Sequence, residues 1–172
     1  AADAYRRILE VDPGELRAYK ALERLAESAG RWAELEELLA REQEYADDQE
    51  QVRLLVRRAR LRSDQNSDAT GAVDLLEDVL ARQRGNMDAR EHLEELMGSA
   101  EQRLRCARIL EPLYQEDGLW RDLCLALRAQ RDHAESPDLA AELLGRIAQT
   151  EEERLGHERG AFSTWCEVLE VA

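Results

Sequence analysis

Residues 30–39, with the sequence GRWAELEELL, return 88 residues further along the chain as residues 118–127, GLWRDLCLAL. Both copies place a glycine two residues before a tryptophan and leucines three and seven residues after it. Beyond this stretch the correspondence continues at an offset of 89. The matched pairs are Leu54 and Leu143, Leu55 and Leu144, Arg57 and Arg146, Ala59 and Ala148, Gly71 and Gly160, Ala72 and Ala161, and Leu80 and Leu169. Agreement over this length indicates an internal repeat.

A second correspondence links the two ends of the chain with its middle. The pattern Ala1…Tyr5…Leu9 reappears as Ala161…Trp165…Leu169, and a middle copy follows Ala72. One repeat is therefore about 71 residues long and the next about 89, and the difference is the length of one helix. We assign the additional helix to 101–117. The predicted organisation is a first unit at about 1–70, a second at about 71–159, and the start of a third at 160–172.

Apolar residues recur every three or four positions between short breaks, which predicts helices throughout and no strand. The expected left-handed caps are Gly30 and Gly118, and Ser136-Pro137 should begin a helix. Pro112 lies inside an apolar pattern, so we expect a kink or a restart there. The predicted helices are 1–12, 15–29, 31–46, 48–63, 69–84, 86–98, 101–117, 119–134, 137–155 and 159–172.

Composition excludes several classes of protein. The 172 residues carry 24 Lys+Arg against 38 Asp+Glu, a net charge of −14, which argues against binding of nucleic acid. No apolar run approaches the roughly 18 residues of a membrane span. With 44% hydrophobic residues, the chain is too apolar to be disordered. We expect a soluble helical protein, with the cytoplasm as its location.

The helix predicted at 48–63 has two apolar faces. Val52, Leu55, Val56 and Ala59 lie on one face, while Leu54 and Leu61 lie on roughly the opposite side. A helix with two apolar faces needs packed neighbours on both sides, as in the interior of a solenoid. The predicted fold is therefore all-α, an α-α superhelix of about ten antiparallel helices.

The repeats resemble the tetratricopeptide repeat, whose pattern is W-x2-L-G-x2-Y…A-x3-F…P. Ala1-x3-Tyr5 followed by Pro13 is similar to the second helix of one repeat, and Tyr19-x2-Leu22 to the start of the next first helix. The departures are Glu23 in place of a small residue, Ala26 in place of tyrosine, and Asp47 in place of a second proline. The resemblance implies a right-handed solenoid whose first helices line a concave groove. It also implies a non-enzymatic scaffold that binds a peptide or protein in that groove.

Five arginines fall within ten residues of this acidic chain, and Arg53, Arg57 and Arg60 share one stripe of the 48–63 helix. A guanidinium suits a carboxylate, so the stripe is a candidate binding site for an acidic partner. The alternative is that these arginines pair with acidic residues of neighbouring helices. Two other functions stay open: a structural spacer or oligomerisation segment, and an accessory domain of a larger protein.

Other residues point to structure rather than to chemistry. Trp32, Trp120 and Trp165 occupy repeat-equivalent apolar positions, which predicts core packing. The three cysteines fit neither a disulfide framework nor a zinc pattern, and we interpret them as reduced thiols that pack as small hydrophobes. His92 with Glu95 is interpreted as a surface pair, and residues 151–153 (EEE) as a solvated helix face. We expect no catalytic residues, no metal and no cofactor.

The two ends carry a further expectation. Ala1 lacks an initiator methionine, and the sequence stops at Ala172 in mid-helix. We expect a piece of a longer solenoid. The last helix offers Phe162, Trp165 and Leu169 to solvent, so it should either self-associate or fray.

Overall fold

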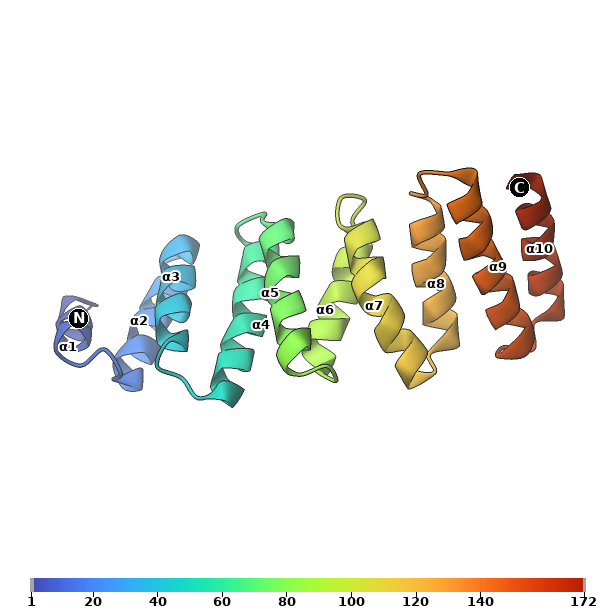
Figure 1. The fold of residues 1–172 in the computed structure, drawn as a ribbon. Helices are drawn as coiled ribbons and strands as arrows, with labels where there is room; N and C mark the ends of the chain where they lie inside the picture. The colour runs from blue at the N-terminus through green and yellow to red at the C-terminus, as the bar shows by residue number, and fades with distance from the viewer. Residues whose placement is uncertain (1, 172) are drawn as a thin grey trace. The chain divides into compact units, whose positions relative to one another are not determined.

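A computed structural model describes residues 2–171, and all regular structure in that range is helical (Figure 1). No helix end differs by more than three residues from the predicted ranges. The all-α prediction is therefore confirmed. The helices are α1 (Ala2–Val11), α2 (Leu16–Ser28), α3 (Trp32–Gln43), α4 (Asp48–Asp64), α5 (Ala69–Arg82), α6 (Met87–Met97), α7 (Arg103–Asp117), α8 (Trp120–Arg131), α9 (Pro137–Glu153) and α10 (Glu158–Val171).

The chain forms two compact units, and the first ends at His92, within α6. In the first unit, each helix from α1 to α4 packs against the helix that follows it. In the second unit, each helix from α7 to α9 does the same. Packing of each helix on its neighbour along the chain is the arrangement of a helical solenoid.

The breaks between helices follow the predicted local chemistry. Gly30 and Gly118 have φ of +64° and +68°, the left-handed conformation that glycine adopts without strain. The Oγ of Ser136 accepts a hydrogen bond of 3.2 Å from the backbone N–H of Leu139, with Pro137 as the first helical residue. Pro112 lies inside α7, which continues across it, so the predicted restart does not occur.

The core follows the repeat. Both apolar faces of α4 are buried as predicted, except that Val56 is half-buried, because α3 and α5 pack against this helix. Most apolar residues matched between the two copies are buried in both units, whereas Leu169, the match of the buried Leu80, is exposed. Less than 5% of the surface is exposed for Leu22 and Leu110, Leu35 and Leu123, Leu39 and Leu127, Leu54 and Leu143, Leu55 and Leu144, and Ala59 and Ala148.

The assignment of the additional helix to 101–117 is wrong. Helix α7 is the counterpart of α2, because both end just before a Gly-x-Trp sequence and both pack against the helix that begins with that tryptophan. Helix α6 in turn corresponds to α1 at an offset of 88, with Ala89, Leu93 and Met97 where the start of the chain has Ala1, Tyr5 and Leu9. At an offset of 88 the pairs are Leu16 and Leu104, Arg17 and Arg105, Leu22 and Leu110, Glu23 and Glu111, and Leu25 and Leu113.

The left-handed cap at Gly30 can be tested by substitution with alanine. Nothing lies within 4 Å of a β-carbon built on Gly30, so only the backbone conformation opposes the change. We expect Gly30→Ala to lower the free energy of unfolding by about 1–2 kcal/mol, the usual cost of left-handed backbone. Gly85 is the control, because a β-carbon there also meets nothing and no positive φ is found. Equal losses in urea unfolding of the two variants would contradict this account.

Candidate binding site

A buried carboxylate in α2 is held by an arginine from α4. The Glu23 side chain is only 3% exposed, and the guanidinium of Arg57 donates to the carboxylates of both Glu23 and Glu27. In the second unit the guanidinium of Arg146, from α9, donates to Glu111 of α7. The same pair therefore recurs at repeat-equivalent positions. In each unit it joins a helix to the next but one along the chain.

A third polar side chain reaches the buried Glu23 and the partly buried Glu111. Gln130 of α8 donates its side-chain amide to Glu111. Its counterpart is Glu42 of α3, which is fully buried and shares a hydrogen bond with Glu23. A hydrogen bond between two carboxyl groups requires a proton on one of them. A proton on one of these two carboxyl groups would therefore do in the first unit what the amide N–H does in the second.

The surroundings place this proton on Glu42. Burial, and then the hydrogen bond to Glu23, raise the pKa of Glu42 from 4.5 to about 7. Burial alone would raise the pKa of Glu23, but the hydrogen bonds from Glu42 and Arg57 lower it overall. The ammonium of Lys20 completes the cluster, with its Nζ 2.9 Å from Oε1 of Glu42 and 3.8 Å from Oε1 of Glu50.

The predicted arginine stripe does not act as one group. Arg53 pairs with Glu50 of its own helix, over 3.3 Å. Arg57 holds Glu23 and Glu27, as the alternative interpretation expected. Two neighbours of the stripe, Arg58 and Arg62, converge on Oε1 of Glu36 at 2.8 and 2.9 Å. Arg60 joins Arg57 at the edge of a pocket.

That pocket, the Trp32 pocket, opens between α2, α3 and α4 and has a volume of about 410 Å³. Its apolar floor is made by leucines beside the half-buried Trp32, and its rim is charged. Its lining consists of Glu27, Trp32, Leu35, Leu39, Arg57, Arg60, Leu61, Asp64 and Gln65.

The second unit contains an equivalent pocket, the Trp120 pocket, between α7, α8 and α9, with a volume of about 220 Å³. Every residue of its lining is the repeat counterpart of one in the Trp32 pocket. The tryptophan, two leucines and one arginine are unchanged, whereas the rim differs. The lining, in the same order, consists of Gln115, Trp120, Leu123, Leu127, Arg146, Gln149, Thr150, Glu153 and Arg154.

The main difference between the two pockets is a cation over the indole. The guanidinium carbon of Arg154 lies 4.9 Å from the centroid of the Trp120 ring, a cation–π contact. The counterpart of Arg154 is Gln65, which carries no charge. The Trp120 ring also lies 3.7 Å from the position of a β-carbon on Gly118, whereas nothing lies within 4 Å of that position on Gly30.

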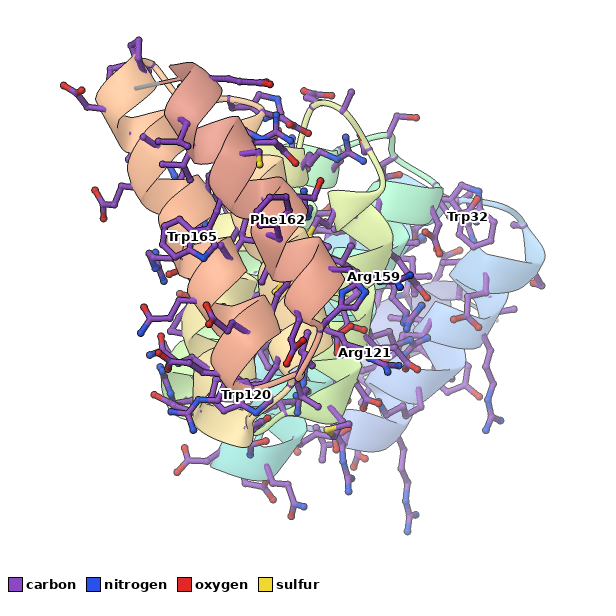
Figure 2. All side chains as sticks on the ribbon, turned by 90° about the vertical axis from the view of Figure 1, so that its right-hand side faces the viewer. Trp32, Trp120, Arg121, Arg159, Phe162 and Trp165 are labelled. Carbon is purple, nitrogen blue, oxygen red and sulfur yellow. The ribbon has the colours of Figure 1, made fainter. Side chains whose placement is uncertain are left out.

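The predicted core role of the tryptophans holds only in part. Trp32 and Trp120 are half-buried, and Trp165 is 42% exposed beside Gly145. Figure 2 shows Trp165 and Phe162 on α10, where Phe162 is 72% and Leu169 81% exposed. The apolar face of α10 is therefore open to solvent, as expected, and self-association through it stays a prediction.

Several other assignments change. His92 is buried, and its Nε2 lies 3.0 Å from Oγ of Ser63, so it is not a surface residue. Glu151 is also buried and accepts a hydrogen bond of 2.8 Å from Thr164, which corrects the solvated interpretation for this residue. Glu152 and Glu153 are exposed, as expected.

The cysteines follow the prediction in two cases of three. Cys106 and Cys124 are buried, and burial raises the pKa of Cys106 to about 11. Cys166 is exposed instead. Within residues 2–171, no group of three or more His, Cys, Asp or Glu side chains could hold a metal ion.

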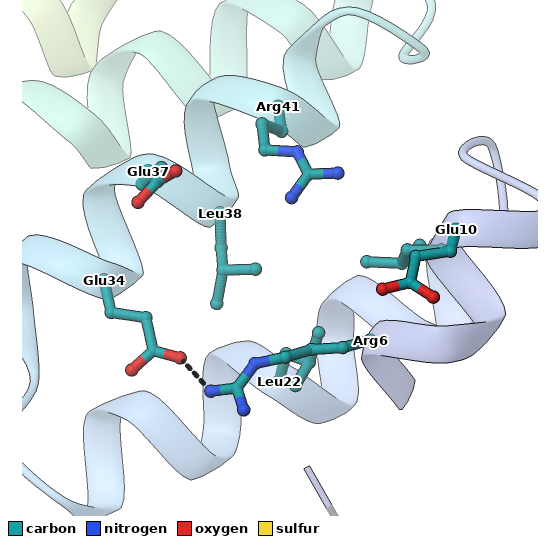
Figure 3. Close-up of a pocket in the computed structure, with 8 residues that line it drawn as sticks. Arg6, Glu10, Leu22, Glu34, Glu37, Leu38 and Arg41 are labelled. Carbon is teal, nitrogen blue, oxygen red and sulfur yellow. Dashed lines mark hydrogen bonds and ion pairs between the residues drawn. The ribbon is translucent and has the colours of Figure 1, made fainter. Parts of the chain in front are cut away.

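A further pocket of the first unit lies between α1, α2 and α3, with a volume of about 240 Å³ (Figure 3). An ion pair of 2.8 Å between Arg6 and Glu34 crosses its mouth. Glu10, Glu37 and Arg41 also line it. This ion pair already satisfies one charge of each sign, so the pocket is a weaker candidate than the Trp32 pocket.

Comparison with known proteins adds no relative: no family model matches the chain, and no curated protein matches it. Among the described helices, none has both the length and the apolar character needed to cross a membrane.

The proton on Glu42 makes stability depend on pH. A carboxyl group whose pKa is raised on folding stabilises the protein fully below its unfolded pKa, and this contribution is lost as the pH rises through the folded pKa. We expect the free energy of unfolding to fall between about pH 5 and 8 by an amount on the order of 3 kcal/mol. Glu42→Gln should remove this loss, because its amide donates at every pH. Chemical denaturation at several pH values measures both.

The reciprocal change Gln130→Glu is the matched control in the second unit. It should introduce the same decline of stability toward alkaline pH. A wild-type protein whose stability is flat from pH 5 to 8, with Glu42→Gln no different from it, would contradict the assignment.

Proposed function

We propose that this chain is a non-enzymatic protein-interaction module that binds a segment of a partner protein in the Trp32 pocket. The observation that carries the proposal is the recurrence of this pocket in both units, with the tryptophan and two leucines of its floor kept and most of its rim changed. A half-buried tryptophan over leucines, ringed by arginine and carboxylates, has the composition of an interaction hot spot. Its volume of about 410 Å³ can accept one or two partner side chains.

The resemblance to tetratricopeptide repeats supports the same site. In that resemblance α2 and α4 take the places of first helices, which line the binding groove of such proteins. Both helices contribute to the Trp32 pocket, through Glu27 on α2 and through Arg57, Arg60 and Leu61 on α4. The pocket thus lies where the resemblance would place a ligand.

An acidic partner has less support than a partner of mixed or basic charge. Arg57 already binds two carboxylates, and Arg53 pairs with Glu50. The chain as a whole carries a net charge of −14, so it attracts basic segments at long range.

A second candidate function is a spacer or oligomerisation segment. It is favoured by the exposed apolar face of α10, formed by Phe162, Trp165 and Leu169. This face belongs to the second unit and does not include the Trp32 pocket.

The proposal is tested by panning a random peptide library on the purified chain. We expect enriched peptides whose binding is lost in Leu61→Glu, which places a charge on the pocket floor, and kept in Leu125→Glu. Leu125 is the control because it is an exposed leucine, 58% accessible, on α8 outside both pocket linings. Circular dichroism must show that both variants fold.

Failure of the proposal would take one of two forms. Panning that enriches no peptide would favour the spacer. Peptides that bind the folded Leu61→Glu variant as tightly as the wild type would place the interaction on another surface.

A further inference from the structure

We infer that the Trp32 pocket binds an arginine side chain of the partner, stacked on Trp32 as Arg154 stacks on Trp120. This inference rests on the proposed function and names the chemistry that the pocket recognises. The two units can be compared with each other. The second unit supplies a cation from its own chain, Arg154, and the first unit has the neutral Gln65 at that position.

The backbone that carries Arg154 is reproduced in the first unit. Arg154 follows α9 with φ −107° and ψ −35°, and its N–H bonds to the carbonyl of Thr150. Gln65 follows α4 with φ −113° and ψ −34°, and its N–H bonds to the carbonyl of Leu61, the counterpart of Thr150. The first unit therefore has the same frame but places a shorter, neutral side chain at the position that covers the indole.

The volumes of the two pockets agree with the replacement of Arg154 by Gln65 at the equivalent position. The Trp32 pocket has about 410 Å³, nearly twice the 220 Å³ of the Trp120 pocket. On the floor the tryptophan and two leucines are unchanged, and the third leucine, Leu61, is replaced by the smaller Thr150 in the tighter pocket. The absence of the arginine therefore contributes to the extra volume. A guanidinium brought by a partner would occupy this space.

The charges around the pocket allow one more cation. In the Trp32 pocket the charges of Glu27 and Asp64 cancel those of Arg57 and Arg60. In the Trp120 pocket a single acidic residue faces two arginines, which leaves one positive charge. A guanidinium added to the Trp32 pocket would bring it to the same balance as its counterpart. Asp64 provides a carboxylate at the rim, and its Oδ1 accepts a hydrogen bond of 2.9 Å from the hydroxyl of Ser63.

Arginine fits this site better than lysine. Its planar guanidinium stacks on an indole face and can still donate hydrogen bonds from its edge to a carboxylate. An ammonium is a compact, strongly hydrated charge that gains less from stacking. The partner is therefore a protein segment that presents an arginine, rather than a segment that is merely basic.

The experiment follows the indole N–H signals of the three tryptophans by NMR during titration with a capped Gly-Arg-Gly peptide. The control peptide carries citrulline, which has the shape of arginine without its charge. We expect the arginine peptide to shift the Trp32 signal, not the Trp120 signal, and to bind about fivefold to tenfold more tightly than the citrulline peptide. Signals are assigned from single Trp→Phe variants.

Two exchanged variants make the test specific. Gln65→Arg should fill the Trp32 pocket from within and abolish the response of Trp32. Arg154→Gln should open the Trp120 pocket and make Trp120 respond. Both positions are exposed at the ends of helices, so the fold should tolerate both changes, and thermal melts check this.

The results separate this inference from the proposed function. Panned peptides that need the Trp32 pocket but carry no arginine would overturn the inference and leave the function standing. No shift of Trp32 at about 10 mM arginine peptide, or an equal response in Gln65→Arg, would also overturn it. A Trp32 response to arginine in a chain that enriches no peptide would support the inference and contradict the proposed function.

Discussion

The structure depends on a buried carboxylate–guanidinium pair that joins alternate helices. Glu23 is almost fully removed from water, so loss of Arg57 would leave a charge in a poorly solvated place, which costs several kcal/mol. The pair fixes α2 relative to α4, and α3 packs against both of these helices. The orientation of α3 then sets where Trp32 lies. In the second unit the pair of Glu111 and Arg146 joins α7 to α9 in the same way, and the position of Trp120 on α8 depends on it.

The helices and their order could be predicted from sequence because their signals are local. Apolar spacing, glycine caps such as Gly30, and the Ser136-Pro137 start each act within a few residues. The buried polar network could not be predicted in this way, since its charges come from helices far apart in the chain. In the sequence Glu23 was notable only as a departure from the tetratricopeptide pattern. Its structural role is recognised from the structure, where Glu111 and Arg146 form the equivalent pair in the second unit.

The correspondence of α7 with α2 was missed for a related reason. Helix α6 contains leucines at the same spacing as α2, and α7 does as well, so periodicity alone does not distinguish them. Contacts with the following helix, which begins with a tryptophan, distinguish them in the structure. The arginine stripe shows the same limit. Its three members share a helix face, but the acidic residues on α2 and on α4 itself divide them between different partners.

This protein has a single lysine side chain, Lys20, among its 24 basic residues. This side chain is 43% exposed, while its ammonium faces Glu23, Glu42 and Glu50. An acylating enzyme or an amine-directed reagent therefore has a single lysine to modify. Acylation there would remove the positive charge beside two buried carboxyl groups. A covalent modification of an exposed side chain would therefore change the electrostatics of the core of the first unit.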